Sequence, residues 1–147
     1  MVNETIPLRG RLQISLNGAV VREIDNLVVD TGAGWVAERI GGQNPTQSIT
    51  NMGIGTGTAV AAAGDTGITT AQTQALATTT VDGAAKTVVF SATFPGAGAG
   101  NSAAITEAGL LTGDATPILV ARTVFNVVNK DEDDEMTITW TITISGT

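Results

Sequence analysis

The chain has 147 residues and no cysteine, a length that fits one domain whose core needs no disulfides. Hydrophobic residues make up 42% of it but aromatic residues only 3%, so the core must come mainly from small and β-branched side chains. The net charge of −7, with seven scattered basic residues, argues against a nucleic-acid partner, because nucleic-acid-binding proteins cluster Lys and Arg.

Residues 1–10 have no basic start followed by an apolar run, so we expect no signal peptide. No segment approaches ~18 consecutive apolar residues, and we therefore expect neither a membrane span nor a membrane partner. Charged residues are only 14% of the chain, which is low for a freely soluble monomer. The low charge suggests that part of the surface lies against another protein.

Residues 9–29 predict a β-hairpin. Leu12, Ile14 and Leu16 alternate with polar residues, and the Asn-Gly dipeptide that follows them can adopt the positive φ angles of a tight turn. The chain then returns through a second apolar stretch. This is the best-marked turn in the sequence.

Residues 30–42 predict one short helix. Trp35, Val36 and Ile40 recur at helical spacing, and the two glycines at the end of the segment are a stop signal. Either of its first two residues, an Asp and a Thr, can act as the N-cap.

The middle of the chain predicts three strands. The first spans residues 49–54, and residues 59–75 carry turn signals without a sustained period, which predicts a long surface excursion. Residues 75–83 and 86–94 predict two further strands joined by an Asp-Gly turn. One face of the second of these strands carries Val88, Phe90, Ala92 and Phe94.

The last third of the chain also predicts strands. A small-residue loop at 95–104 precedes a short strand at 105–111, and residues 118–128 are apolar on both faces apart from Arg122, as in a strand covered on both sides. The acidic run 131–135 predicts the next reversal. The C-terminal strand alternates strictly, and one face carries Met136, Ile138, Trp140, Ile142 and Ile144.

These elements predict an all-β fold in a single domain spanning residues 1–147. About seven or eight short strands with one short helix indicate an antiparallel β-sandwich or a jelly-roll-like barrel. The predicted core comprises Trp35, Phe90, Phe94, Phe125, Ile138, Trp140 and Ile142.

The glycines of the stretch 51–68 raise the question of a phosphate-binding loop. A dinucleotide fingerprint needs Gly at the third position of the motif, where this chain has Thr58 or Val60, and a P-loop needs a lysine that is absent here. We therefore expect no cofactor. The alternate glycines Gly53, Gly55 and Gly57 instead favour close approach of another backbone or of a packed Trp, followed by a mobile loop. If the stretch has a function, we expect it to be backbone contact with a neighbouring subunit.

The sequence shows no catalytic constellation, because His, Cys and Tyr are absent and the carboxylates are dispersed. The acidic run 131–135 lacks the Gly and Glu of a calcium loop, so we predict no metal site there, although weak cation binding at a symmetric interface stays open. Glu107 interrupts an apolar strand and can pair with Arg122 on a neighbouring one. We favour a structural ion pair over catalysis for these two residues.

Three stretches together resemble small structural proteins of tailed-bacteriophage particles. They are "NLVVDTGAGWVAERIGG", "MGIGTGTAVAAAGDTGI", and "ITEAGLL" followed by "ILVARTVFNVVNKDEDDEMTITWTITIS". Their order and spacing cover roughly residues 26–145, and the "ITEAGLL" strand is also similar to segments in the β-domains of phage tail fibres. The resemblance implies a virion component that is made in the host cytoplasm. It implies no catalytic residue.

Two functions are compatible with this resemblance. The first is a capsid cement or decoration protein, a homo-oligomer (dimer or trimer) that binds the major capsid protein or other virion proteins. Residues 1–8 would then form an N-terminal arm with Ile6 and Leu8 as anchors. The second is a tail-fibre or appendage module that binds a host surface. The scarcity of aromatic residues favours the first, and an enzyme is a distant third class.

Overall fold

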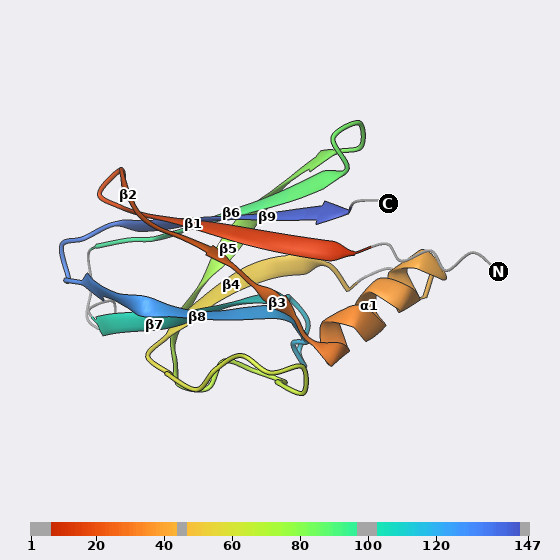
Figure 1. Cartoon of the computed structure of the whole chain (residues 1–147), viewed down its shortest axis with the longest axis horizontal. Coiled ribbons are helices and arrows are strands. Elements are labelled where there is room, and N and C mark those ends of the chain that lie inside the picture. The colour runs from red at the N-terminus through yellow and green to blue at the C-terminus, as the bar shows by residue number, and fades with distance from the viewer. Residues whose placement is uncertain (1–6, 44–46, 97–102, 145–147) are drawn as a thin grey trace.

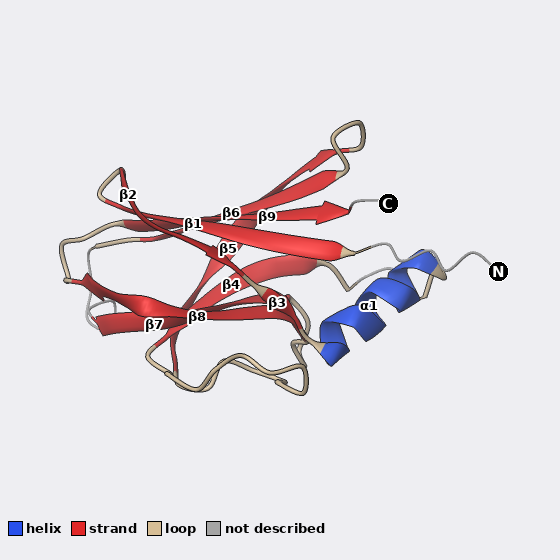
Figure 2. Ribbon diagram, in the orientation of Figure 1, coloured by secondary structure: helices blue, strands red, loops and turns tan. Residues whose placement is uncertain are grey.

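The computed structural model describes residues 7–43, 47–96 and 103–144, and within them nine strands and one helix (Figures 1 and 2). The strands are β1 (Leu8–Leu16), β2 (Ala19–Asp25), β3 (Leu27–Val28), β4 (Ile49–Gly55), β5 (Ala71–Asp82), β6 (Thr87–Phe94), β7 (Ala103–Thr112), β8 (Leu119–Lys130) and β9 (Met136–Ile144), and the helix is α1 (Asp30–Ile40).

All the strands belong to one antiparallel sheet with the order β2-β1-β9-β6-β5-β4-β7-β8-β3. The sheet folds over at β5, because the first half of this long strand pairs with β4 and its second half pairs with β6. Two layers result, and the fold is a nearly closed barrel with the character of a sandwich (Figure 1). The predicted all-β antiparallel class is confirmed, with nine strands in the described ranges instead of seven or eight.

Side chains close the barrel between its two end strands, β2 and β3. The two residues of β3 pair with only part of β8. Beyond them, the Arg22 guanidinium of β2 donates hydrogen bonds to the carbonyls of Asn126 and Val127 on β8, at 3.3 and 2.9 Å. The Thr123 hydroxyl donates to the Asp25 carbonyl at 3.0 Å. These contacts join the edges where no strand ladder forms.

The predicted hairpin and its tight turn are present as β1 and β2. Asn17 and Gly18 have φ angles of 50° and 83°, the positive values that this type of turn requires. The Asn17 side chain also contacts the predicted acidic reversal, donating to Asp134 at 2.7 Å and accepting from the Glu135 N–H at 2.9 Å. Two turns far apart in the sequence thus fasten one end of the barrel.

Helix α1 begins and ends close to the predicted positions, but its predicted N-cap is wrong. The N-cap residue is Val29, which makes no side-chain capping bond. The Thr31 hydroxyl instead donates to the Leu119 carbonyl at 2.7 Å, and the Asp30 N–H donates to the Ala63 carbonyl at 2.8 Å. Tertiary contacts with β8 and the loop therefore replace local capping.

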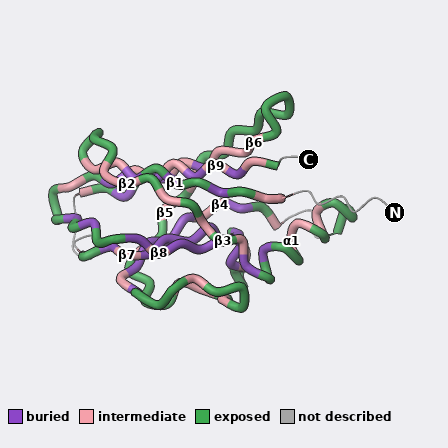
Figure 3. Tube along the Cα trace, in the orientation of Figure 1, coloured by how far each residue is buried: buried purple, intermediate pink, exposed green. Residues whose placement is uncertain are grey.

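The core lies between the two layers, and most of its predicted members are buried (Figure 3). They are Phe90, Phe94, Phe125, Ile138, Trp140 and Ile142. Trp35 is the exception, since it is only half buried. Helix α1 lies at one end of the barrel rather than over its centre, so Trp35 packs at the edge of the core and its indole N–H donates to the Gln47 carbonyl at 3.1 Å.

Strand β8 is covered on both sides, as predicted. One face joins the main core, while Leu119 packs on the other face with Val29, Leu111 and Ile68 in a second, smaller cluster. Helix α1 and the loop at residues 56–70 form this outer cover (Figure 1). The predicted surface excursion is present over residues 59–70 as a mostly exposed loop, but it ends earlier than predicted, because β5 already starts at Ala71. The loop is anchored on the sheet by Ile68, which packs against the second cluster.

The predicted loop at 95–104 is partly outside the described residues. Ala103 and Ala104 belong to β7, where they pair with Lys130 and Asn129 of β8. The prediction thus ended the loop two residues too late.

Candidate functional site

The predicted ion pair between Glu107 and Arg122 is present on neighbouring strands β7 and β8. The Nη2 and Nε atoms of Arg122 donate to one carboxylate oxygen of Glu107 at 2.8 and 3.0 Å, and both side chains are fully buried. Asp65 from the 56–70 loop completes the cluster, since it lies 2.7 Å from Nη1 of Arg122. Sequence reasoning missed Asp65, although it is the only charged residue between Arg39 and Asp82.

Backbone groups satisfy the rest of this cluster. The Glu107 carboxylate accepts hydrogen bonds from the N–H groups of Gly57, Thr69 and Thr70, at 2.9, 3.1 and 2.8 Å. Nη2 of Arg122 also donates to the Ala59 carbonyl and the Thr69 hydroxyl, at 3.0 and 2.8 Å. Strand β7, strand β8 and the loop are thereby joined through two buried charges.

The cluster sets two carboxylates against one guanidinium, and backbone N–H groups stabilise the remaining negative charge. Burial alone raises the pKa of Glu107, but the N–H groups of Thr70, Thr69 and Gly57 together with the Arg122 guanidinium hold it below its usual value. The pKa of Asp65 is lowered as well, first by the Ala62 N–H and then by Arg122. Both carboxylates stay ionised at neutral pH and have their partners within the protein.

The three glycines of β4 and its exit face the chain's own loop, so their assignment to a neighbouring subunit is wrong. Gly53, Gly55 and Gly57 are all buried. A Cβ atom added to Gly55 would lie 2.5 Å from the Thr70 carbonyl oxygen, and one added to Gly57 would overlap the Glu107 carboxylate. The expected close approach of backbone does occur, but the backbone belongs to the chain's own loop. The missing side chains let this loop lie directly over the buried charges.

Replacing Gly55 with alanine is expected to lower the free energy of unfolding by about 1–3 kcal/mol, because the new methyl group meets backbone that cannot move aside easily. Urea unfolding measures the change. Gly64→Ala in the 56–70 loop is the matched control, since a Cβ there meets no atom within 4 Å. Equal stability of the two variants would contradict the packing described above.

The buried carboxylate also predicts an acid dependence. A pKa that is lowered on folding contributes stability above the unfolded-chain pKa of about 4, and this contribution is lost as the pH falls through the folded-state pKa. The difference in unfolding free energy between wild type and Glu107→Gln should therefore shrink below about pH 4. Denaturant titrations from neutral to acid pH measure it, and a difference independent of pH would be the contrary result.

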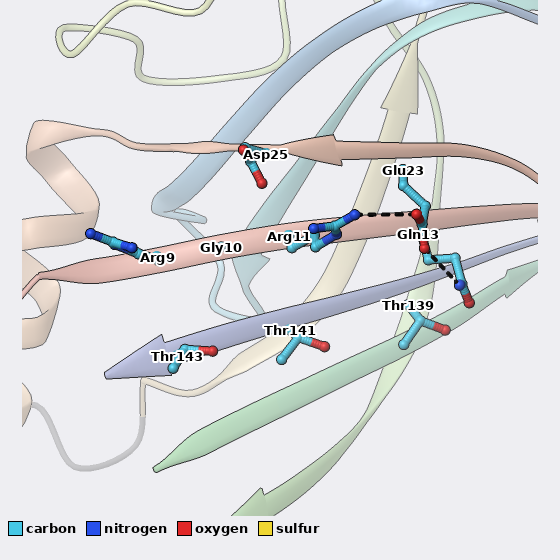
Figure 4. A pocket seen from close by; sticks show the side chains of 9 residues that line it. All are labelled: Arg9, Gly10, Arg11, Gln13, Glu23, Asp25, Thr139, Thr141 and Thr143. Carbon is cyan, nitrogen blue, oxygen red and sulfur yellow. Dashed lines mark hydrogen bonds and ion pairs between the residues drawn. The ribbon is translucent and has the colours of Figure 1, made fainter. Parts of the chain in front are cut away.

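A polar hollow of about 600 Å³ lies on the outer face of the β1–β9 layer (Figure 4). Thr139, Thr141 and Thr143 of β9 line it, beside two arginines of β1. The Arg11 guanidinium and the Gln13 amide both donate to Glu23, each at 3.2 Å. These side chains offer hydrogen bonds and charge but no nucleophile paired with a base.

An apolar groove of about 650 Å³ lies at the open end of the barrel, beside α1 and the β5–β6 hairpin. We call it the barrel-mouth groove, and its lining includes Leu8, Trp35, Ile40, Val81, Phe90 and Ile144. Three aliphatic residues on it are exposed to an unusual degree: Ile40 by 83%, Val81 by 70% and Ile144 by 41%. Sequence reasoning missed the groove, because strands and a helix distant in the chain build it.

The predicted arm at residues 1–8 is wrong at its C-terminal end. Leu8 is the first residue of β1, where it pairs with Ile144 of β9 and lines the barrel-mouth groove. Ile6, the other predicted anchor, lies outside the described residues.

Over the described ranges, no three His, Cys, Asp or Glu side chains group as metal ligands. In the acidic turn, both Asp134 oxygens already accept bonds, from the Asn17 amide and the Asp131 N–H. Among the described residues, no helix is long and apolar enough to cross a membrane. Comparison with protein-family models, curated proteins and solved structures finds no match for the chain.

Proposed function

We propose that the chain is a non-enzymatic structural protein of a tailed-bacteriophage particle, a capsid cement or decoration protein that binds and stabilises the major capsid shell. The ordered motifs from residue 26 to residue 145 support this class by their resemblance to small virion proteins. The barrel-mouth groove and the burial of the ion-pair cluster support the decoration role within this class.

The barrel-mouth groove carries the proposal. Exposed aliphatic side chains in a concave surface are unfavourable in water, and contiguous apolar patches of this kind commonly mark contacts with other proteins. Ile40, Val81 and Ile144 project from three different elements onto this one surface. A protein that works by contact would use such a surface as its docking face.

The buried charges suit a scaffold better than a catalyst. Glu107 and Arg122 are fully buried and fully occupied by each other, by Asp65 and by backbone groups. A general acid or base must instead reach a substrate within hydrogen-bond distance. The cluster therefore serves to hold the loop on the sheet.

A tail-fibre or appendage module is the second candidate, and the polar hollow favours it. Threonine hydroxyls beside Arg9 and Arg11 could bond the hydroxyl groups of a host glycan (Figure 4). Glycan sites usually add an exposed aromatic platform, however, and the aromatic residues named above are buried, apart from the half-buried Trp35. The decoration role remains our first choice.

Copy number distinguishes these functions. Densitometry of stained gels of purified particles should show the protein at the abundance of a shell component, comparable with the major capsid protein. Abundance at the level of a fibre would support the second candidate instead. Absence from purified particles would overturn both.

A further inference from the structure

The second half of β5 has a neighbouring strand on only one side. Residues up to Leu76 pair with β4, whereas Ala77 to Asp82 pair with β6. Over the described ranges, no strand pairs with the other edge of residues 77–82, which we call the free edge of β5. Figure 1 shows that the tip of the β5–β6 hairpin projects from the barrel, so a neighbouring molecule can reach this edge.

The register shows which backbone groups point toward the free edge. In antiparallel pairs, every second residue exchanges hydrogen bonds with its partner, and the residues between them point the other way. The Ile144 N–H donates to the Lys86 carbonyl at 2.9 Å, so the even-numbered residues of β6 bond to β9 and the odd-numbered ones to β5. Their partners in β5 are even-numbered. The N–H and C=O groups of Ala77, Thr79 and Val81 therefore point toward the free edge.

Nothing in the sequence of this edge discourages pairing. Natural proteins usually protect an exposed edge with charged residues, proline or a bulge. Residues 71–81 contain no charged residue and no proline, and the pairing of β5 with β6 has no register shift. Thr79 and Val81 also line the barrel-mouth groove, and Val81 is 70% exposed. The edge thus combines backbone hydrogen-bonding groups with apolar side chains, the chemistry that an added strand recognises.

The same edge of a second copy is complementary to it. Antiparallel pairing about a two-fold axis at Thr79 uses all three outward-pointing residues and forms about six backbone hydrogen bonds. On the groove side, each Ala77 then lies opposite a Val81, so a small side chain faces a larger one. On the other side, each Thr78 lies opposite a Thr80, a favourable cross-strand pair.

The charges also permit this arrangement. The charged residue nearest to the pairing in the sequence is Asp82, at one end of the free edge. The two copies of Asp82 lie at opposite ends of the paired segment, about 20 Å apart. This is more than twice the Debye length of about 8 Å at physiological salt. Self-pairing therefore brings no like charges together, although the chain carries a net charge of −7.

We propose that two copies of the chain pair through the free edges of β5, antiparallel and about a two-fold axis at Thr79. The pairing joins the two β5–β6 hairpins into one continuous sheet that crosses the dimer. It does not depend on the proposed function, and its test needs no phage particle, so the two can fail separately.

Sedimentation equilibrium of the full chain over a wide range of concentration tests the pairing. Wild type should dimerise, and Thr79→Lys should weaken the dimer roughly tenfold or more, because the axis places the two lysines directly opposite each other. Val81→Lys should weaken it as well. Gln72→Lys is the matched control, since this exposed residue of β5 lies in the half that β4 already covers, and it should leave the dimer intact. Thermal melting verifies that each variant is folded.

Mixing two variants tests the register. Thr79→Asp should also weaken the homodimer, but an equimolar mixture of Thr79→Lys and Thr79→Asp should form a heterodimer, because opposite charges then face each other across the axis. A mixture that stays monomeric would overturn the proposed register.

Amide hydrogen exchange tests the backbone bonds. The amides of Ala77, Thr79 and Val81 should exchange roughly tenfold or more slowly at concentrations where the dimer forms, while those of Thr78 and Thr80 stay protected at all concentrations. A monomeric wild type would overturn the proposal, and so would a dimer that tolerates Thr79→Lys. Equal protection of the three amides in a dilute monomer would show that the chain covers its own edge, which also overturns it.

Discussion

Replacing Arg122 with methionine is expected to lower the free energy of unfolding by about 3–5 kcal/mol. The substitution keeps an unbranched side chain of similar length but leaves the Glu107 carboxylate fully buried without its cation. It also releases Asp65, which fastens the 56–70 loop. Denaturant unfolding followed by circular dichroism measures the loss, and faster proteolysis within the loop should accompany it.

Two controls accompany this prediction. Arg9→Met removes an exposed arginine from β1 and should change stability by no more than about 0.5 kcal/mol. Glu107→Gln should lower the free energy of unfolding by less in the Arg122→Met variant than in wild type. In that variant it removes the carboxylate that Arg122→Met has left without its cation. Additive effects of the two substitutions would contradict the coupling inferred from their contact.

Replacing Trp140 with alanine is also expected to lower the free energy of unfolding by about 3–5 kcal/mol. The side chain is fully buried at the centre of the core, and its indole N–H donates to the Asn26 side chain at 2.9 Å. The variant loses the largest side chain of the core together with this bond.

Trp140→Phe separates these two contributions. It keeps an aromatic ring in the core while removing the N–H donor, so its loss should be clearly smaller than that of the alanine variant. An alanine variant that melts at the wild-type temperature would show that the assigned inward face of β9 is wrong.

Local signals were enough to predict much of the barrel. The strict alternation around Trp140 predicts β9, because a strand with one buried face requires a period of two. The Asn17-Gly18 dipeptide predicts the β1–β2 turn, because few other residue pairs accept two consecutive positive φ angles. Such features depend on neighbours in the sequence and need no knowledge of the fold.

The features that the sequence did not predict depend on contacts between distant residues. Gly55 was assigned to an external partner because a glycine shows that something approaches closely but not what approaches it, and here it is the Thr70 carbonyl of the same chain. The pairing of Glu107 with Arg122 could be predicted from the sequence, since the two residues lie on consecutive strands. Asp65 was not, because only the folded loop brings it to Arg122.

The barrel-mouth groove also depends on the assembled fold. Trp35 was assigned to the core from helical spacing, which indicates an apolar face but not how completely the rest of the fold covers it. Because α1 lies at the end of the barrel, that face forms one wall of the groove beside Val81 and Ile144. The surface that carries the proposed function could thus be located only from the structure.

The most direct test of the proposed function is electron microscopy of intact particles in which this protein carries a label. We predict label distributed over the capsid shell at regular positions, as expected for a protein that stabilises repeated shell contacts. Label confined to the tail, or particles without label, would contradict the decoration role.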